Sequence, residues 1–185
     1  MSTPKNISSS LLAASFCLAA CVPGISSAID GTINITGTVT ASTCKINGAV
    51  SPVTVAVALP TVSTAALAAT GNVAGRTPFT IALSGCTAAL TKAQTYFEPG
   101  PTVDTTTNNL LLQGGTGTAA NVELQLLNSD YTQILLGNSA TSQNSLQANL
   151  VSGAANLSYY AQYVATGVSG AGTANSSVTF TMVYQ

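Results

Sequence analysis

The chain has 185 residues, with four Lys or Arg, five Asp or Glu and no histidine, which gives a formal net charge of −1 at pH 7. So few cations exclude the basic surface that nucleic acids and anionic membranes require. Without histidine, acid–base catalysis would need paired carboxylates, and Asp104, Glu123 and Asp130 form no recognisable motif. We therefore expect no enzyme, no cofactor and no metal site.

Residues 1–28 have the pattern of a secretory signal peptide. Lys5 gives a positive start, the apolar run Leu11–Val22 is too short to cross a bilayer, and Ser26–Ala28 supplies small residues before a cut. An alternative stays open, because Leu18–Cys21 fits the pattern of a lipid-modified cysteine. In that case Cys21 would anchor the chain to a membrane.

Apolar and polar residues alternate directly after this cut, in the stretch IDGTINITGTV (29–39). Such alternation is typical of a β-strand with one buried face. The C-terminus has the same pattern, since Val178, Phe180, Met182 and Tyr184 alternate with the residues between them. Terminal strands usually fray unless a sheet holds them. The two ends could pair within one domain or exchange between molecules, and the pattern leaves both possibilities open.

The segment between these ends predicts an all-β sandwich, because Gly or Asn turn signals recur about every ten residues. Its length suffices for one such domain. Ser63–Ala69 predicts a short helical turn and residues 99–120 predict a long loop. Including both ends, we predict strands at 33–43, 52–58, 78–86, 94–98, 121–128, 132–136, 146–151, 157–165 and 174–184.

Two of the four cysteines, Cys17 and Cys21, leave with the signal peptide. Cys44 and Cys86 remain, and a pair of cysteines in an exported chain is most simply a disulfide. Closing a loop of about 43 residues would stabilise the fold by roughly 4 kcal/mol on the chain-entropy model.

The residues in this order resemble a known family, the pilin subunits of chaperone–usher fimbriae, and are close to its type 1-like major subunits. The resemblance covers nearly all of the predicted mature chain. It is carried by GTINITGTV before Cys44, LPTVSTAAL (59–67), FTIALSGC (79–86), YYAQYVATG (159–167), Gly172 and the penultimate Tyr184.

This resemblance implies an incomplete immunoglobulin-like β-sandwich that lacks its last strand and so has an apolar groove. A periplasmic chaperone would fill the groove first, and at an outer-membrane usher the N-terminal strand of the next subunit would replace it. The implied partners are identical pilin subunits, the chaperone, the usher and a tip adhesin, with no nucleic acid. The implied location is a fimbrium on the bacterial surface, reached through the periplasm.

Position by position, the resemblance divides the mature chain into a donor-strand extension at 29–37 and a pilin domain at 38–185. Gly31 would lie where the groove has no room for a side chain. The extension ahead of Gly31 is short for the family, and a cut at Ala20 would lengthen it. The implied donor residues are Ile29, Gly31, Ile33 and Ile35. The implied residues of the acceptor groove and chaperone contact are Gly172, Val178, Phe180, Met182 and Tyr184.

The predicted function is that of a structural subunit in the shaft of an adhesive fimbria. The alternatives are a minor or adaptor subunit, a surface protein anchored at Cys21, and host-receptor binding by the assembled shaft. Aromatic side chains in strands are more often core residues than sugar platforms. The tyrosines that could nevertheless stack on a sugar are Tyr96, Tyr131, Tyr159, Tyr160 and Tyr163.

Overall fold

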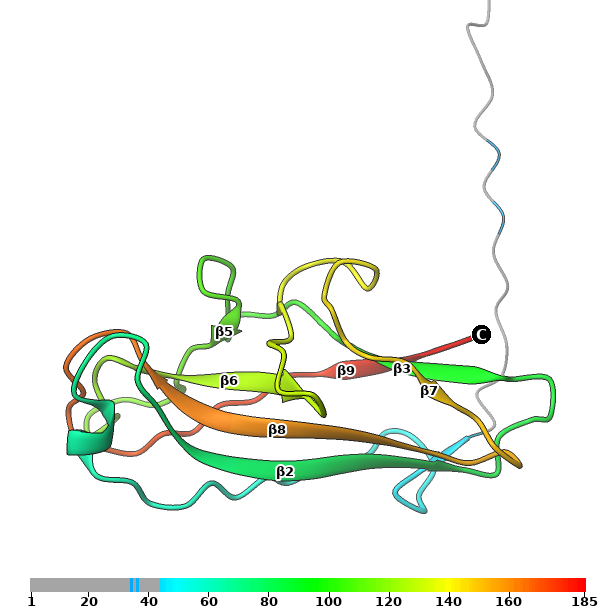
Figure 1. Cartoon of the computed structure of the whole chain (residues 1–185), viewed down its shortest axis with the longest axis horizontal. Helices are drawn as coiled ribbons and strands as arrows, with labels where there is room; N and C mark the ends of the chain where they lie inside the picture. The colour runs from blue at the N-terminus through cyan, green and yellow to red at the C-terminus, as the bar shows by residue number, and fades with distance from the viewer. Residues whose placement is uncertain (1–33, 35, 37–43) are drawn as a thin grey trace, which may run out of the picture. The chain divides into compact units, whose positions relative to one another are not determined.

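A computed structural model describes residues 34, 36 and 44–185 of the chain. The chain divides into two units, Met1–Val39 and Thr40–Gln185, and the fold below is that of the second unit. Within its described residues the regular structure is β-strand plus one short 3₁₀ helix, η1 (Thr64–Leu67) (Figure 1). No helix in this part is long and apolar enough to cross a membrane.

The larger sheet has six strands, and its two longest lie side by side (Figure 1). They pair antiparallel from Val73 with Val164 to Leu83 with Ala155, and a β-bulge lies between Ala74 and Thr77. In sheet order the strands are β1 (Lys45–Ile46), β2 (Val73–Ser84), β8 (Ala155–Ala165), β6 (Val122–Asn128), β5 (Asn109–Leu110) and β4 (Val103–Asp104).

The smaller sheet has three strands, in the order β7 (Ala148–Asn149), β3 (Lys92–Phe97) and β9 (Phe180–Tyr184). The last strand pairs antiparallel with β3, from Ala93 with Tyr184 to Phe97 with Phe180. Among the described strands, β9 has a partner on one side only.

The core contains the inward residues of both sheets, because alternate side chains of a strand face the same side. Tyr159 of β8 is 1% exposed, and its ring centre lies 5.5 Å from those of Phe79 and of Phe97. Burial raises the pKa of the Tyr159 hydroxyl. Gln143 is also fully buried, and its side chain takes the place of a neighbouring strand beside Phe97 of β3. Its Oε1 accepts a hydrogen bond from Phe97 N at 2.8 Å, and its Nε2 donates one to Phe97 O at 2.7 Å.

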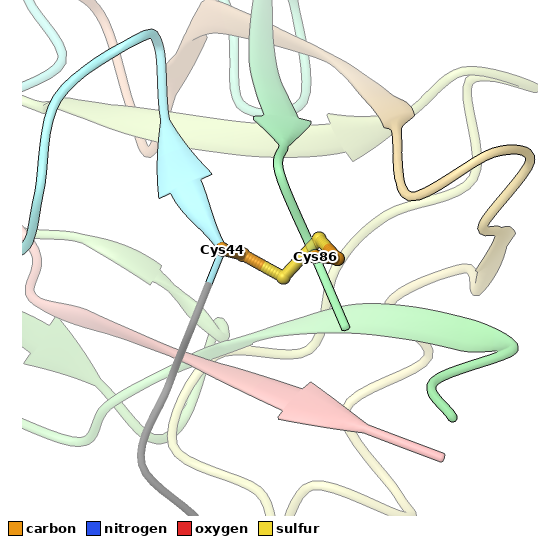
Figure 2. Close-up of a disulfide and its surroundings, with 2 residues drawn as sticks. All are labelled: Cys44 and Cys86. Atoms are coloured by element: carbon orange, nitrogen blue, oxygen red, sulfur yellow. A yellow bond between two sulfur atoms is a disulfide. The ribbon is translucent and has the colours of Figure 1, made fainter. Parts of the chain in front are cut away.

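The predicted disulfide between Cys44 and Cys86 is confirmed (Figure 2). It joins the residue directly ahead of β1 to a residue just after β2, with 4.2 Å between the two Cα atoms. The 42-residue separation gives the loop-closure stabilisation of about 4 kcal/mol expected from the sequence.

Several predicted elements are confirmed. Four strands overlap predicted ones: β2 at 78–86, β3 at 94–98, β6 at 121–128 and β8 at 157–165. β2 begins five residues earlier than predicted, at Val73. The predicted helical turn is η1, whose N-cap Ser63 accepts a hydrogen bond from Ala65 N at 3.2 Å.

Other predicted elements are wrong or shorter than predicted. The predicted loop at 99–120 contains β4 and β5, while the described structure has no strand at 52–58 or 132–136. The C-terminal strand begins at Phe180 rather than 174, and the strand at 146–151 is reduced to β7. Alternation reports that one face is buried, but it does not report whether the backbone has a hydrogen-bonding partner. The predicted strand at 33–43 lies almost entirely outside the described residues.

Candidate functional site

An apolar groove of about 860 Å³ lies between the extended segment 51–59 and the C-terminal segment 176–184. Within the described part of the chain, no charged side chain lines it. Side chains from β2, β3, β5, β6 and β8 form its floor. These are Phe79, Ile81, Phe97, Leu110, Leu124, Leu126 and Ala161.

One wall of the groove is the segment 51–59. Its apolar side chains Val53, Val55, Val57 and Leu59 are half-buried against the core, and the residues between them are exposed. This wall was not predicted as part of the site. The available signal was the alternation in VTVAVAL, which predicted only another strand of the sandwich.

The other wall is the C-terminal segment. Val178, Phe180, Met182 and Tyr184 all line the groove and pack partly buried against the core. The intervening Thr179 and Thr181 are exposed. The structure therefore brings together four of the five residues that the sequence analysis proposed for the groove, although their role in binding stays a prediction.

The backbone of this second wall has an open side. Gln185 and Lys92 exchange two backbone hydrogen bonds of 3.0 Å, and Glu98 N donates to Thr179 O at 2.8 Å. Because hydrogen-bonding direction alternates along a strand, the backbone groups of Phe180 and Met182 point away from β3. In the described structure β9 is the edge strand on that side. An open strand edge beside an apolar groove is the geometry that receives an added strand.

Gly172, the fifth proposed groove residue, lies elsewhere. It lines a second cavity of about 600 Å³, which also includes Ser63 and Leu67 of the η1 region and meets the groove at Leu59 and Leu124. Burial raises the pKa of the Tyr163 hydroxyl in this cavity. Gly172 therefore lines this adjoining cavity, and its role in the groove and chaperone contact stays a prediction.

Gly172 is needed for a close approach of two backbones. Its neighbour Thr173 donates to Gly117 O at 2.8 Å and accepts from Ala119 N at 2.9 Å. A Cβ on Gly172 would overlap the backbone from Gly117 to Ala119, so this glycine is required by steric contact.

We expect Gly172→Ala to lower the free energy of unfolding by about 1–3 kcal/mol, because the 117–119 backbone must move. Thermal unfolding of the purified subunit measures this as a fall in Tm of about 2–4 °C for each kcal/mol. Gly115→Ala is the matched control, since a Cβ there meets nothing within 4 Å. An equal Tm for the two variants would contradict the steric role of Gly172.

The predicted donor residues Ile29, Gly31, Ile33 and Ile35 lie outside the described residues, so their role stays a prediction. Asn34 and Thr36 are described, and both are exposed.

The two sheets, the disulfide and the open-edged groove define an incomplete immunoglobulin-like β-sandwich. The family model for type-1 fimbrial protein, A matches residues 59–185. The chain is 44% identical to the major fimbrial subunit SMF-1 of Stenotrophomonas maltophilia, over 89% of this chain and 98% of that protein. It is 43% identical to an Escherichia coli F17 fimbrial protein, over 91% and 94% of the two chains. The chain belongs to the type-1 fimbrial protein family and is a structural subunit of a pilus.

Solved structures agree on the fold. A subunit from the structure of a chaperone–usher pilus superposes with a TM-score of 0.53 at 22% identity, over 89% of this chain and all of that chain. The P pilus rod subunit PapA superposes with a TM-score of 0.52 at 19% identity, over 78% of this chain and all of that chain. The predicted fold class is therefore confirmed.

Proposed function

We propose that this subunit polymerises by donor-strand exchange, in which residues 29–37 of one copy fill the groove of the next copy. The observation that carries the proposal is the apolar groove beside the open edge of β9. The wall segment 51–59 and the donor segment 29–37 are equal in length, each spanning about 30 Å as a strand. The donor segment can therefore run the length of the groove.

The energetics favour a long-lived joint between subunits. Burying Ile29, Ile33 and Ile35 would contribute roughly 5–9 kcal/mol, at about 1.5–3 kcal/mol each. Backbone hydrogen bonds to Phe180 and Met182 would add about 1 kcal/mol apiece before the cost of ordering the donor. Such a joint suits a fibre that is exposed to shear.

An unfilled groove would be an aggregation site during export, because an apolar surface beside a strand edge attracts other chains. We propose that a periplasmic chaperone occupies it and that an outer-membrane usher receives the complex. The resemblance to subunits of chaperone–usher pili supports this route. Residues 1–28 would be the signal peptide, 38–185 the pilin domain, and the destination a surface fimbrium.

Within the fimbrium we propose a place in the shaft, next to identical subunits and, at the fibre end, a tip adhesin. The names of the relatives support this place, since SMF-1 is a major fimbrial subunit. Membership of a family of structural subunits also supports a role without catalysis. The lipid anchor at Cys21 stays a prediction outside the described residues.

A synthetic peptide of residues 29–39 tests donor-strand exchange directly. Added in excess to assembling full-length subunits, it should occupy grooves and shorten the fibres seen by electron microscopy. A peptide of the same composition in scrambled order is the control, because it lacks the alternation. Fibres of equal length with both peptides would contradict the proposal.

A further inference from the structure

A cluster on the six-stranded sheet is not explained by polymerisation. It consists of Arg76, Tyr131 and Tyr160, which we call the Arg–Tyr platform. The guanidinium carbon of Arg76 lies 4.6 Å from the ring centre of Tyr131, and the ring centres of Tyr131 and Tyr160 are 4.9 Å apart. Arg76 lies at the bulge of β2, Tyr160 in β8, and Tyr131 in the turn after β6. Arg76 and Tyr131 are both exposed.

The guanidinium of Arg76 is held in place by the buried side-chain amide of Gln162. Its Nε donates to Gln162 Oε1 at 2.8 Å, and Gln162 in turn donates from Nε2 to Gln125 Oε1 at 2.8 Å. Gln162 is only 3% exposed, so it is a rigid support. Among the described residues the terminal nitrogens of Arg76 have no hydrogen bond or ion pair. An oriented guanidinium with free terminal N–H groups is suited to bidentate binding of an anion.

Tyr131 occupies a backbone position that favours glycine. Its φ is +69°, in the left-handed region that bulky residues rarely adopt. The turn is fixed, since Tyr131 N donates to Asn128 O at 3.0 Å and Thr132 N donates to Asp130 Oδ1 at 3.0 Å. Tyr131 is nevertheless 53% exposed. Strained residues of this kind recur at ligand-binding positions.

The platform and the groove lie on opposite faces of the sheet. Along β8, Tyr160 and Gln162 alternate with Tyr159 and Ala161, and Ala161 lines the floor of the groove. Alternate residues of a strand point to opposite faces. A strand added in the groove therefore leaves the platform uncovered.

We propose that the Arg–Tyr platform binds a sugar ring that carries a carboxylate, of the uronate or sialate type. The terminal N–H groups of Arg76 bind the carboxylate through two parallel hydrogen bonds. The rings of Tyr131 and Tyr160 pack against the apolar face of the sugar, and their hydroxyls offer hydrogen bonds at its edge.

An exogenous anion fits this platform better than a second copy of the chain does. Each side-chain carboxylate in the described part already accepts an internal hydrogen bond. Glu98 accepts from Thr181, Asp104 from Thr106, Glu123 from Asn109 and Asp130 from Thr132. The side-chain carboxylates that a neighbouring subunit could offer from this part therefore already have an internal partner, whereas a free sugar carboxylate is bound only to water.

Many copies of the platform along one fibre would bind more tightly than a single copy, which rests on the proposed polymerisation. A shallow surface site binds one sugar weakly, but a fibre presents one platform per subunit. Linked sites can exceed the affinity of a single site by about 10²–10⁴-fold. A shaft with this property would bind surfaces that carry many acidic sugars.

Purified full-length fibres, tested by biolayer interferometry, decide the proposal. The sensors carry a glucuronate-terminated disaccharide, sialyllactose or neutral lactose, so the arms also separate uronate from sialate. We expect binding to at least one carboxylated sugar and about tenfold less or none to lactose. Arg76→Gln and Tyr131→Gly should each reduce that binding about tenfold or more, through the lost charge-assisted hydrogen bonds and the lost ring.

The variants are chosen to keep the fold. Tyr131→Gly relieves the left-handed backbone, so its Tm should equal or exceed that of the unmodified subunit. Lys92→Gln removes a different exposed cation, from the other sheet, and should bind as the unmodified fibre does. The same assay on unassembled subunits measures one platform at a time and tests the site even where no fibre forms.

Three results would overturn the platform. The first is binding to the carboxylated sugars no stronger than to lactose, and the second is full binding by Arg76→Gln or Tyr131→Gly. The third is fibres that ignore all the sugars but lose side-by-side bundling in Arg76→Gln, which would assign the platform to a second copy. Normal fibres that bind no sugar would contradict the platform but not donor-strand exchange, so the experiment distinguishes the two proposals.

Discussion

Met182→Asp should prevent the subunit from assembling into fibres. Met182 lies on the groove wall that β9 forms, and no charged side chain in the described part of the groove could neutralise the new carboxylate. A donor strand would seal that carboxylate from water, which costs several kcal/mol for an unpaired charge. A loss of about 4 kcal/mol raises the dissociation constant about 10³-fold. Electron microscopy and detergent-resistant multimers on gels measure the effect.

Two control variants separate the groove from the strand itself. Thr179→Asp adds the same charge to the exposed face of the same segment and should assemble normally. Met182→Leu keeps an apolar side chain of similar volume in the groove and should also assemble. Fibres from Met182→Asp as abundant as those from Thr179→Asp would show that this wall does not receive the donor.

The strands that the sequence analysis predicted well are those with both a buried face and a neighbouring strand. β6 and β8 satisfy both conditions, since they pair from Val122 with Ala165 to Asn128 with Tyr159. The segment 52–58 satisfies only the first condition. Its valines are half-buried, yet no described strand pairs with it. A one-sided hydrophobic pattern gives the same signal in both cases, so burial could be predicted and pairing could not.

The same limit explains what was missed at the groove. The alternation from Val178 to Tyr184 predicted a strand at the end of the chain, and the family resemblance then placed it beside the groove. The opposite wall lies in the interior of the sequence, where its alternation resembles that of any sandwich strand. Gly172 was placed in the groove by the family resemblance alone. The close approach to Gly117 and Ala119 that requires this glycine involves residues more than fifty positions earlier, a contact that sequence spacing does not report.

The Arg–Tyr platform was beyond prediction for a different reason. It joins Arg76, Tyr131 and Tyr160 through the β2–β8 pairing and a turn whose φ is positive at a tyrosine. Propensity rules assign such a backbone to glycine or asparagine, so an exposed tyrosine there gives no turn signal. Only the register of the strands brings the three side chains together.

Replacing both Ile33 and Ile35 with Asp should abolish polymerisation, with the largest effect that we expect. Two isoleucines contribute roughly 3–6 kcal/mol on burial. A loss of about 6 kcal/mol would weaken the joint between subunits about 10⁴-fold, before the desolvation of two carboxylates is added. The groove of the variant is unchanged, so its folded domain should keep its Tm and should still bind a peptide of residues 29–39.

The matched control carries the same two substitutions on the other face of the donor strand. Asn34→Asp with Thr36→Asp adds two carboxylates at exposed positions that alternate with the isoleucines. We expect this control to form fibres, since its new charges point away from the groove and stay in water. A mixture of the Ile33/Ile35 variant with unmodified subunits should give shortened fibres, because the variant can accept a strand but cannot donate one. Fibres of normal length from the variant alone would show that the donor is not the 29–37 segment, and would direct the search to another strand.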